Sequence, residues 1–219
     1  MNESYPLKYS VDYPDRELDR LTSFFRLFTV IPIAIVLGTV SHTAFGGWSD
    51  YGTTLVTAGG ILFGGPLLMI LFRGKYPRWW FDWNRELLRF TYRVGAYFAL
   101  QSDEYPSTDE EQYVHLEIDY PDVENDLSRG MVLVKWFLAI PHYFVLLFLA
   151  IGAFFAVIYA WFVILFTGRY PRGVFDYVVG FDRWGLRVAA YAFILTTDKY
   201  PPFSLQEQTG SSSTGTPTA

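Results

Sequence analysis

Long apolar blocks separated by polar segments are the dominant pattern of this sequence. The first block covers residues 21–40, the second covers 55–72, and a third apolar run covers 131–166. A membrane-spanning helix needs about 20 mainly apolar residues, so each of the first two blocks predicts one span. The third run has room for two short spans that turn near Ile151, Gly152 and Ala153. The pattern therefore predicts four transmembrane helices, and the alternative for the third run is one long, tilted helix.

The polar segments that border these blocks occur twice. Asp12-Tyr13-Pro14-Asp15 returns as Asp119-Tyr120-Pro121-Asp122, and Gly74-Lys75-Tyr76-Pro77-Arg78 returns as Gly168-Arg169-Tyr170-Pro171-Arg172. A long unit that recurs in this way predicts a tandem duplication. We place the first repeat at residues 1–108, the second at 109–205, and a disordered tail rich in Ser, Thr and Gly at 206–219.

Each repeat opens with alternating apolar and polar residues, at positions 5–13 and 114–120, which is typical of a half-buried strand. Because an isolated strand is unstable, we expect these two strands to pair beneath the membrane. A polar helix and an apolar span with an Ile-Pro step follow, at Pro32 and Pro141, where we expect a bend. A second span and an amphipathic helix complete each repeat. The predicted fold is thus an α-helical integral membrane protein with a small pair of juxtamembrane strands.

Arginines at every fourth position share one face of the helix that follows each Gly-x-Tyr-Pro-Arg motif. They are Arg89 and Arg93 in the first repeat and Arg183 and Arg187 in the second. One hypothesis is that they bind lipid phosphates at the headgroup level. The other, which we favour at this point, is that they form a structural charge network with four duplicated aspartates, Asp12, Asp15, Asp119 and Asp122.

Aromatic and small residues predict two further kinds of contact. Tryptophans favour the membrane interface, which nominates Trp79, Trp80, Trp83 and Trp184 as interfacial anchors. Small residues at helical spacing let helix backbones approach closely, and they are Gly60, Gly64, Gly152, Ala156 and Ala160. We interpret them as the seam between the two repeats, and a seam with another subunit is the alternative.

Charge and composition restrict orientation and chemistry. Apart from Arg26 and Lys135, the basic residues lie outside the apolar blocks, and residues 41–54 contain none, which predicts a multi-pass protein of the inner (plasma) membrane with both termini cytoplasmic. No secretory signal is visible at the first residues. The net charge of −5 argues against nucleic acid as a partner, and the absence of cysteine excludes thiol chemistry.

No catalytic or cofactor motif is recognisable. The three histidines have no second metal ligand at a suitable spacing, and neither a nucleophile elbow nor a phosphate-binding loop is present. His142 lies inside an apolar block beside Pro141, so it is either a hydrogen-bonded structural residue or a proton relay. We therefore expect neither enzyme activity nor a cofactor nor a metal.

Several motifs of the second repeat resemble one membrane family. These are Ile140-Pro141-His142, Ala160-Trp161-Phe162, Arg183-Trp184, the segment 166–172 and the segment 195–203. Together they are similar to the prokaryotic family catalogued as domain of unknown function 4389. The resemblance covers nearly the whole chain up to Leu205, and the first repeat follows the pattern more loosely. What it implies is a polytopic membrane protein, without an assigned reaction.

Two functions fit these observations. The first is a non-catalytic accessory or scaffold subunit that packs against a larger membrane complex, or against a second copy of itself, and contacts lipid headgroups. The second is a component of a transporter or channel for lipid or another amphiphile, with its pathway between the two repeats. Few polar residues are available to line such a pathway, which favours the first.

Overall fold

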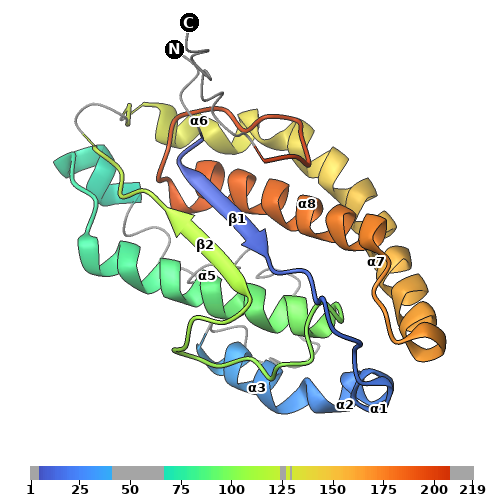
Figure 1. Cartoon of the computed structure of the whole chain (residues 1–219). Helices are drawn as coiled ribbons and strands as arrows, with labels where there is room; N and C mark the ends of the chain where they lie inside the picture. The colour runs from blue at the N-terminus through green and yellow to red at the C-terminus, as the bar shows by residue number, and fades with distance from the viewer. Residues whose placement is uncertain (1–4, 41–66, 124–126, 129, 208–219) are drawn as a thin grey trace, which may run out of the picture.

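The computed structural model describes residues 5–40, 67–123, 127–128 and 130–207, which form a mostly helical fold with two strands (Figure 1). In chain order the elements are β1 (Leu7–Val11), α1 (Arg20–Phe24), α2 (Arg26–Thr29), α3 (Ile31–Val40), η2 (Met69–Arg73), α5 (Arg78–Phe98), β2 (Val114–Ile118), α6 (Met131–Leu138), α7 (Ile140–Thr167), α8 (Arg172–Ala189) and η3 (Ala190–Ile194). Most of the predicted second span, with Gly60 and Gly64, lies outside the described residues.

The two predicted strands pair with each other, as the alternating pattern indicated. They are antiparallel, and Tyr9 lies opposite Leu116 at the centre of the register. Alternate side chains of both strands are buried, whereas Lys8 and Glu117 extend from the opposite face and form an exposed ion pair of 3.3 Å. One face of the sheet therefore packs on the core and the other is polar.

Both amphipathic helices begin after a tight turn that needs a left-handed residue. Gly74 and Gly168 have φ values of 59° and 73°, which glycine adopts without a steric penalty. After the helices, Leu100 and Leu195 adopt φ values of 65° and 63°, which are uncommon for a side chain of this size. Both leucines are almost fully buried. Their packing in the core offsets the cost of this backbone conformation.

Each Ile-Pro step separates two helices. Pro32 is the second residue of α3 and Pro141 is the second residue of α7, at positions where the missing proline N–H has no intrahelical partner to lose. The predicted first span consists of α1, α2 and α3, and the Ile-Pro step coincides with the break between α2 and α3. The bends expected at Pro32 and Pro141 are breaks between consecutive helices.

The predicted turn near Ile151, Gly152 and Ala153 is wrong, and with it the count of four spans. α7 is one helix of 28 residues that runs through this position, in agreement with the alternative of a single long helix. A continuous helix satisfies its backbone hydrogen bonds internally, whereas a hairpin would leave several unpaired within an apolar run. In the described part of the chain, α7 alone is long and apolar enough to cross a membrane.

The elements form layers in which the two predicted repeats exchange contacts. β1 packs on α8 and β2 packs on α5, so each strand lies against the helix of the other repeat (Figure 1). α7 covers the far side of α8, and α3 packs on α5. The order from the polar surface outward is therefore the sheet, then α5 and α8, then the apolar helices.

Candidate functional site

The equivalent arginines Arg89 and Arg183 make equivalent contacts with the two strands. Arg89 donates from Nε and Nη2 to the carbonyl oxygen of Leu116, both at 3.0 Å, and Arg183 donates from Nε to the carbonyl oxygen of Tyr9 at 2.9 Å. Leu116 and Tyr9 are the paired residues at the centre of the sheet. A carbonyl on the outer side of a two-stranded sheet has no strand partner, so each guanidinium occupies an acceptor that would otherwise be free.

Arg93 and Arg187 hold the segments that follow their helices. Arg93 donates to the carbonyl oxygens of Glu110 and Thr108, while Arg187 donates to those of Ser204 and Gln206. Both arginines are at least 97% buried, at 3% and 1% exposure, and this burial lowers the pKa of each guanidinium. Main-chain carbonyls are thus the acceptors for all four arginines of the predicted network.

The four aspartates of that network lie at the surface. Asp12, Asp15, Asp119 and Asp122 are exposed. The carboxylate of Asp12 contacts His115 Nε2 at 3.0 Å, and this hydrogen bond is the main cause of the raised pKa of His115. The predicted role of the arginine rows in structure therefore has a geometric basis, but through carbonyl oxygens and not through these carboxylates.

The two Asp-Tyr-Pro turns dock on the two Gly-x-Tyr-Pro-Arg turns. Tyr13 donates its hydroxyl to the carbonyl oxygen of Tyr170 at 2.5 Å, and Tyr120 donates to that of Tyr76 at 2.6 Å. Arg172 lies 4.5 Å from the ring centre of Tyr13, and Arg78 lies 5.5 Å from that of Tyr120. Each strand end is thus fixed to the start of the amphipathic helix of the other repeat.

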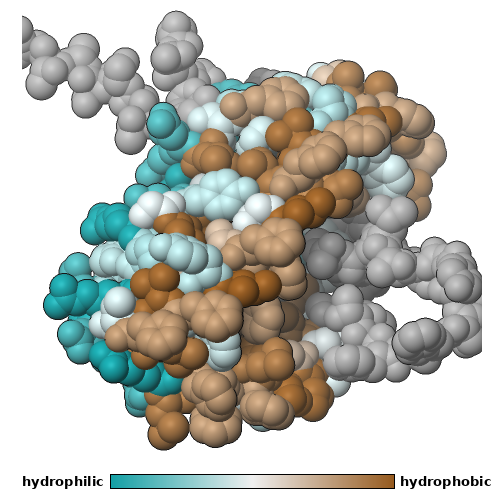
Figure 2. Space-filling model, turned by 90° about the vertical axis from the view of Figure 1, so that its right-hand side faces the viewer, coloured by the Kyte–Doolittle hydropathy of each residue, from teal (hydrophilic) through white to brown (hydrophobic). Residues whose placement is uncertain are grey.

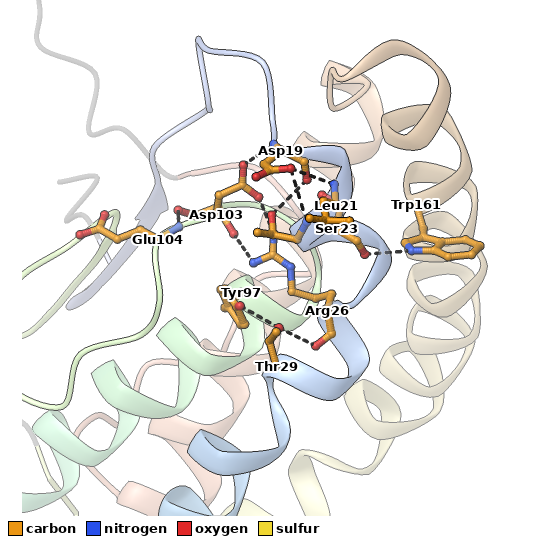
Figure 3. A network of polar contacts seen from close by, with 11 residues as sticks. Asp19, Leu21, Ser23, Arg26, Thr29, Tyr97, Asp103, Glu104 and Trp161 are labelled. Atoms are coloured by element: carbon orange, nitrogen blue, oxygen red, sulfur yellow. Dashed lines mark hydrogen bonds and ion pairs between the residues drawn. The ribbon is translucent and has the colours of Figure 1, made fainter.

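A buried cation anchors the loop that follows each amphipathic helix. In the first repeat, Arg26 donates to Asp103 at 2.5 Å and to the carbonyl oxygen of Ser102 at 2.9 Å (Figure 3). In the second, Lys135 is fully buried and donates to the carbonyl oxygen of Thr197, with Asp198 Oδ1 at 2.7 Å. Sequence reasoning missed this role, although Asp103 and Asp198 occupy the same place in the duplicated Leu-x-x-Asp-x-Tyr-Pro motif.

Ser23 and Trp161 attach the start of the first repeat to α7. Trp161 donates its indole N–H to the carbonyl oxygen of Ser23 at 3.1 Å (Figure 3). Asp19, at the start of the same segment, caps α1 through its side chain and accepts with its own carbonyl from Thr22. In the same network, the hydroxyls of Thr29 in α2 and Tyr97 in α5 lie 2.9 Å apart, so the polar contacts in Figure 3 join α1, α2, α5 and α7.

The contacts of His142 are those of a residue with a structural role. Its Nδ1 accepts from the indole N–H of Trp184 at 3.1 Å, and its ring stacks on Phe203 at 4.0 Å between ring centres. In the first repeat the corresponding positions are Ile33 and Phe90, which pack in one apolar cluster. An apolar pair thus fills the same place in the other repeat, which favours the structural interpretation of His142 over a proton relay.

The predicted interfacial tryptophans divide into two pairs. Trp79 and Trp83 are 70% and 48% exposed, whereas Trp80 and Trp184 are buried in the core. Of the small residues, Gly152 lies against Tyr177 of α8, where an added Cβ would be 2.5 Å from the hydroxyl. Ala160 is fully buried and belongs to the main core, while Ala156 is half-buried. Gly152 therefore faces α8, so part of the contact lies within the second repeat.

Exposed apolar side chains of α1, α2, α3, α6 and α7 form a broad face on the described part of the protein (Figure 2). On α7 it is a stripe at helical spacing, whose most exposed members are Phe144, Phe148, Phe154, Phe155 and Phe166. Figure 2 shows this face as a broad brown area, with hydrophilic residues gathered along one edge. An apolar surface of this extent on a soluble monomer is uncommon and is typical of an interface with protein or lipid.

Metal chemistry finds no support in the described ranges, where no group of three or more His, Asp or Glu side chains is arranged to hold an ion. The described residues form a mostly helical fold, and one helix among them is long and apolar enough to cross a membrane. Residues 129–204 match the model of the family described as domain of unknown function (DUF4389), the family that the motifs of the second repeat resemble. No curated protein and no solved structure matched the chain.

Proposed function

We propose that this protein is a membrane-embedded, non-catalytic accessory or scaffold subunit that packs against a larger membrane complex and contacts lipid headgroups. The observation that carries the proposal is the exposed apolar face of α1–α3 and α6–α7. Burial of a large apolar side chain gains about 1.5–3 kcal/mol, so a face of this kind strongly favours transfer out of water. In a membrane complex, both lipid and the apolar surface of a partner protein could cover this face and remove it from water.

A non-catalytic role is supported by the way the polar groups are used. The arginines that could bind an anionic substrate donate to main-chain carbonyls, and the buried cations Arg26 and Lys135 pair with Asp103 and Asp198. These contacts stabilise the fold. The transporter alternative is weaker, because the centre between the two repeats is filled by Tyr9 and Leu116, which are 0% and 2% exposed.

The basic residues that we expect to contact lipid headgroups are different from the four arginines of the predicted network. The turns next to the apolar helices carry exposed cations, at Arg73, Lys75 and Arg78 in the first repeat and at Arg169 and Arg172 in the second. Positive charge is retained on the cytoplasmic side of a membrane. We therefore place the polar layer and both termini on the cytoplasmic side of the inner (plasma) membrane.

Membrane extraction and native purification test the proposal. We expect the protein to stay with the membrane fraction in alkaline carbonate and to purify in mild detergent with defined protein partners. Phe148→Glu combined with Phe155→Glu should release it from the membrane, while Glu117→Lys on the polar sheet should not. Recovery of the wild-type protein in the soluble fraction would refute membrane embedding, and recovery without any protein partner would refute the accessory role.

A further inference from the structure

α7 has one face exposed along its whole length and the other covered. The exposed stripe extends from Phe144 near the start to Phe166 near the end. The opposite face includes His142, Ala153, Ala160 and Ile164, which are buried. A helix that crosses a bilayer on its own would expose its whole circumference to lipid, so the covered face needs an explanation.

The cover is α8, which runs antiparallel to α7. Trp184 contacts His142 near the start of α7, and Tyr177 donates to the carbonyl oxygen of Leu149 at 2.9 Å further along. The short turn at Gly168 then links the end of α7 to the start of α8. α7 and α8 therefore lie side by side over the same stretch, and both would be at the same depth in a membrane that α7 crossed (Figure 1).

The sheet lies beside the same stretch of α8. β1 packs on the side of α8 away from α7, and Arg183 connects the two through the carbonyl oxygen of Tyr9. The polar face of the sheet exposes Lys8, Asp12 and Glu117. If α7 stood across the bilayer, these charged groups and those of α8 would lie beside it at the depth of the hydrocarbon.

That placement is energetically unfavourable. A charged side chain at the centre of a bilayer costs at least about 2.5–3.5 kcal/mol, and several would be placed there together. The alternative orientation has no such cost. With α7 parallel to the membrane surface, its apolar stripe enters the lipid, α8 lies beneath it, and the charged sheet remains in water.

We propose that α7 lies in the plane of the membrane, embedded through its exposed face in a single phospholipid leaflet, although it is long enough to cross. This inference rests on the proposed membrane embedding. The apolar side chains of α1–α3 and α6 enter the same leaflet. The exposed cations Arg20, Arg169 and Arg172, close to the end of α7 at Gly168, then lie at the level of the lipid phosphates.

Depth measurement along α7 tests this orientation in the full chain, which contains no cysteine. Single cysteines at Phe144, Phe155 and Phe166, labelled with an environment-sensitive fluorophore, report depth through quenching by lipids brominated at defined acyl positions. Adjacent probes are about 16 Å apart along the helix at 1.5 Å per residue. We expect the three depths to agree within a few ångströms, with circular dichroism matching the wild type.

A central probe more than about 10 Å deeper than both end probes would show a crossing helix and overturn the in-plane orientation. Absence of quenching at all three sites would instead overturn the proposed membrane embedding itself. Sidedness gives a second measurement at exposed positions that flank the apolar run: Gly130→Cys and Thr167→Cys should both react with an impermeant maleimide from the same side. Reaction from opposite sides would contradict the proposal.

Discussion

Asp182 of α8 is a half-buried acid whose replacement should change the way stability depends on pH. The equivalent position of α5 is Leu88, which is buried in the main core. Burial raises the pKa of Asp182 to about 7. Tyr9 from β1, Tyr92 from α5 and Tyr170 before α8 are its electrostatic neighbours.

The sign and size of the effect follow from this pKa. Because the folded-state pKa lies above the ordinary aspartate value of 3.8, the folded protein favours the protonated carboxyl, and stability falls as the pH rises between about 4 and 7. At 1.36 kcal/mol per unit, ionisation of this group costs the folded state on the order of 4 kcal/mol above pH 7. Asp182→Leu and Asp182→Asn remove the cost, so both variants should gain stability at pH 8 relative to the wild type.

Thermal unfolding of the purified protein in detergent, followed by near-ultraviolet circular dichroism from pH 4 to pH 8, measures this difference. We expect the Tm of the wild type to fall with rising pH more steeply than that of either variant. Asp176→Asn is the matched control, because Asp176 lies exposed on the same helix. A wild-type slope retained in Asp182→Asn would refute the reasoning.

Three further predictions concern individual contacts of the fold. Lys135→Met should cost about 3 kcal/mol of stability in chemical unfolding, since Asp198 loses its buried partner, and adding Asp198→Asn should restore part of the loss. Gly152→Ala should cost about 1–3 kcal/mol through the clash with Tyr177, with partial rescue by Tyr177→Phe, whereas Gly173→Ala, where a Cβ has free space, should not destabilise. Arg89→Gln and Arg183→Gln should each cost about 1.5–3 kcal/mol and leave lipid retention in native mass spectrometry unchanged; loss of bound lipid with unchanged stability would instead favour a headgroup role for these arginines.

The sequence predicted those elements that depend on local periodicity. Alternation located both strands, and the Gly-x-Tyr-Pro-Arg motifs located the starts of α5 and α8. The turn within α7 failed for a physical reason. Hydropathy measures only whether a residue tolerates an apolar environment, and a run of this length is compatible with a hairpin or with one helix. Tertiary contact decided between them, because α8 covers α7 past the predicted turn.

The partners of the arginines could not be derived from the sequence. Acidic side chains are visible in a sequence, and the duplicated aspartates were therefore the obvious acceptors. Every residue also carries a carbonyl oxygen, and which of these lacks a strand partner depends on the final register of β1 and β2. Arg89 and Arg183 reach the carbonyls of the opposing pair Leu116 and Tyr9, a choice fixed by the fold.

The exchange of contacts between the repeats also limits where function can lie. The strand of each repeat is held by an arginine of the other, and each Asp-Tyr-Pro turn docks on the Gly-x-Tyr-Pro-Arg turn of the other. A single repeat would lose these contacts and would leave its strand unpaired, with the apolar face of the strand exposed to water, so neither half should fold alone. The most faithfully duplicated residues are therefore those that join the halves. Under the proposed function, binding to lipid or to another subunit uses the surface that these contacts leave exposed, which is the apolar face of α7.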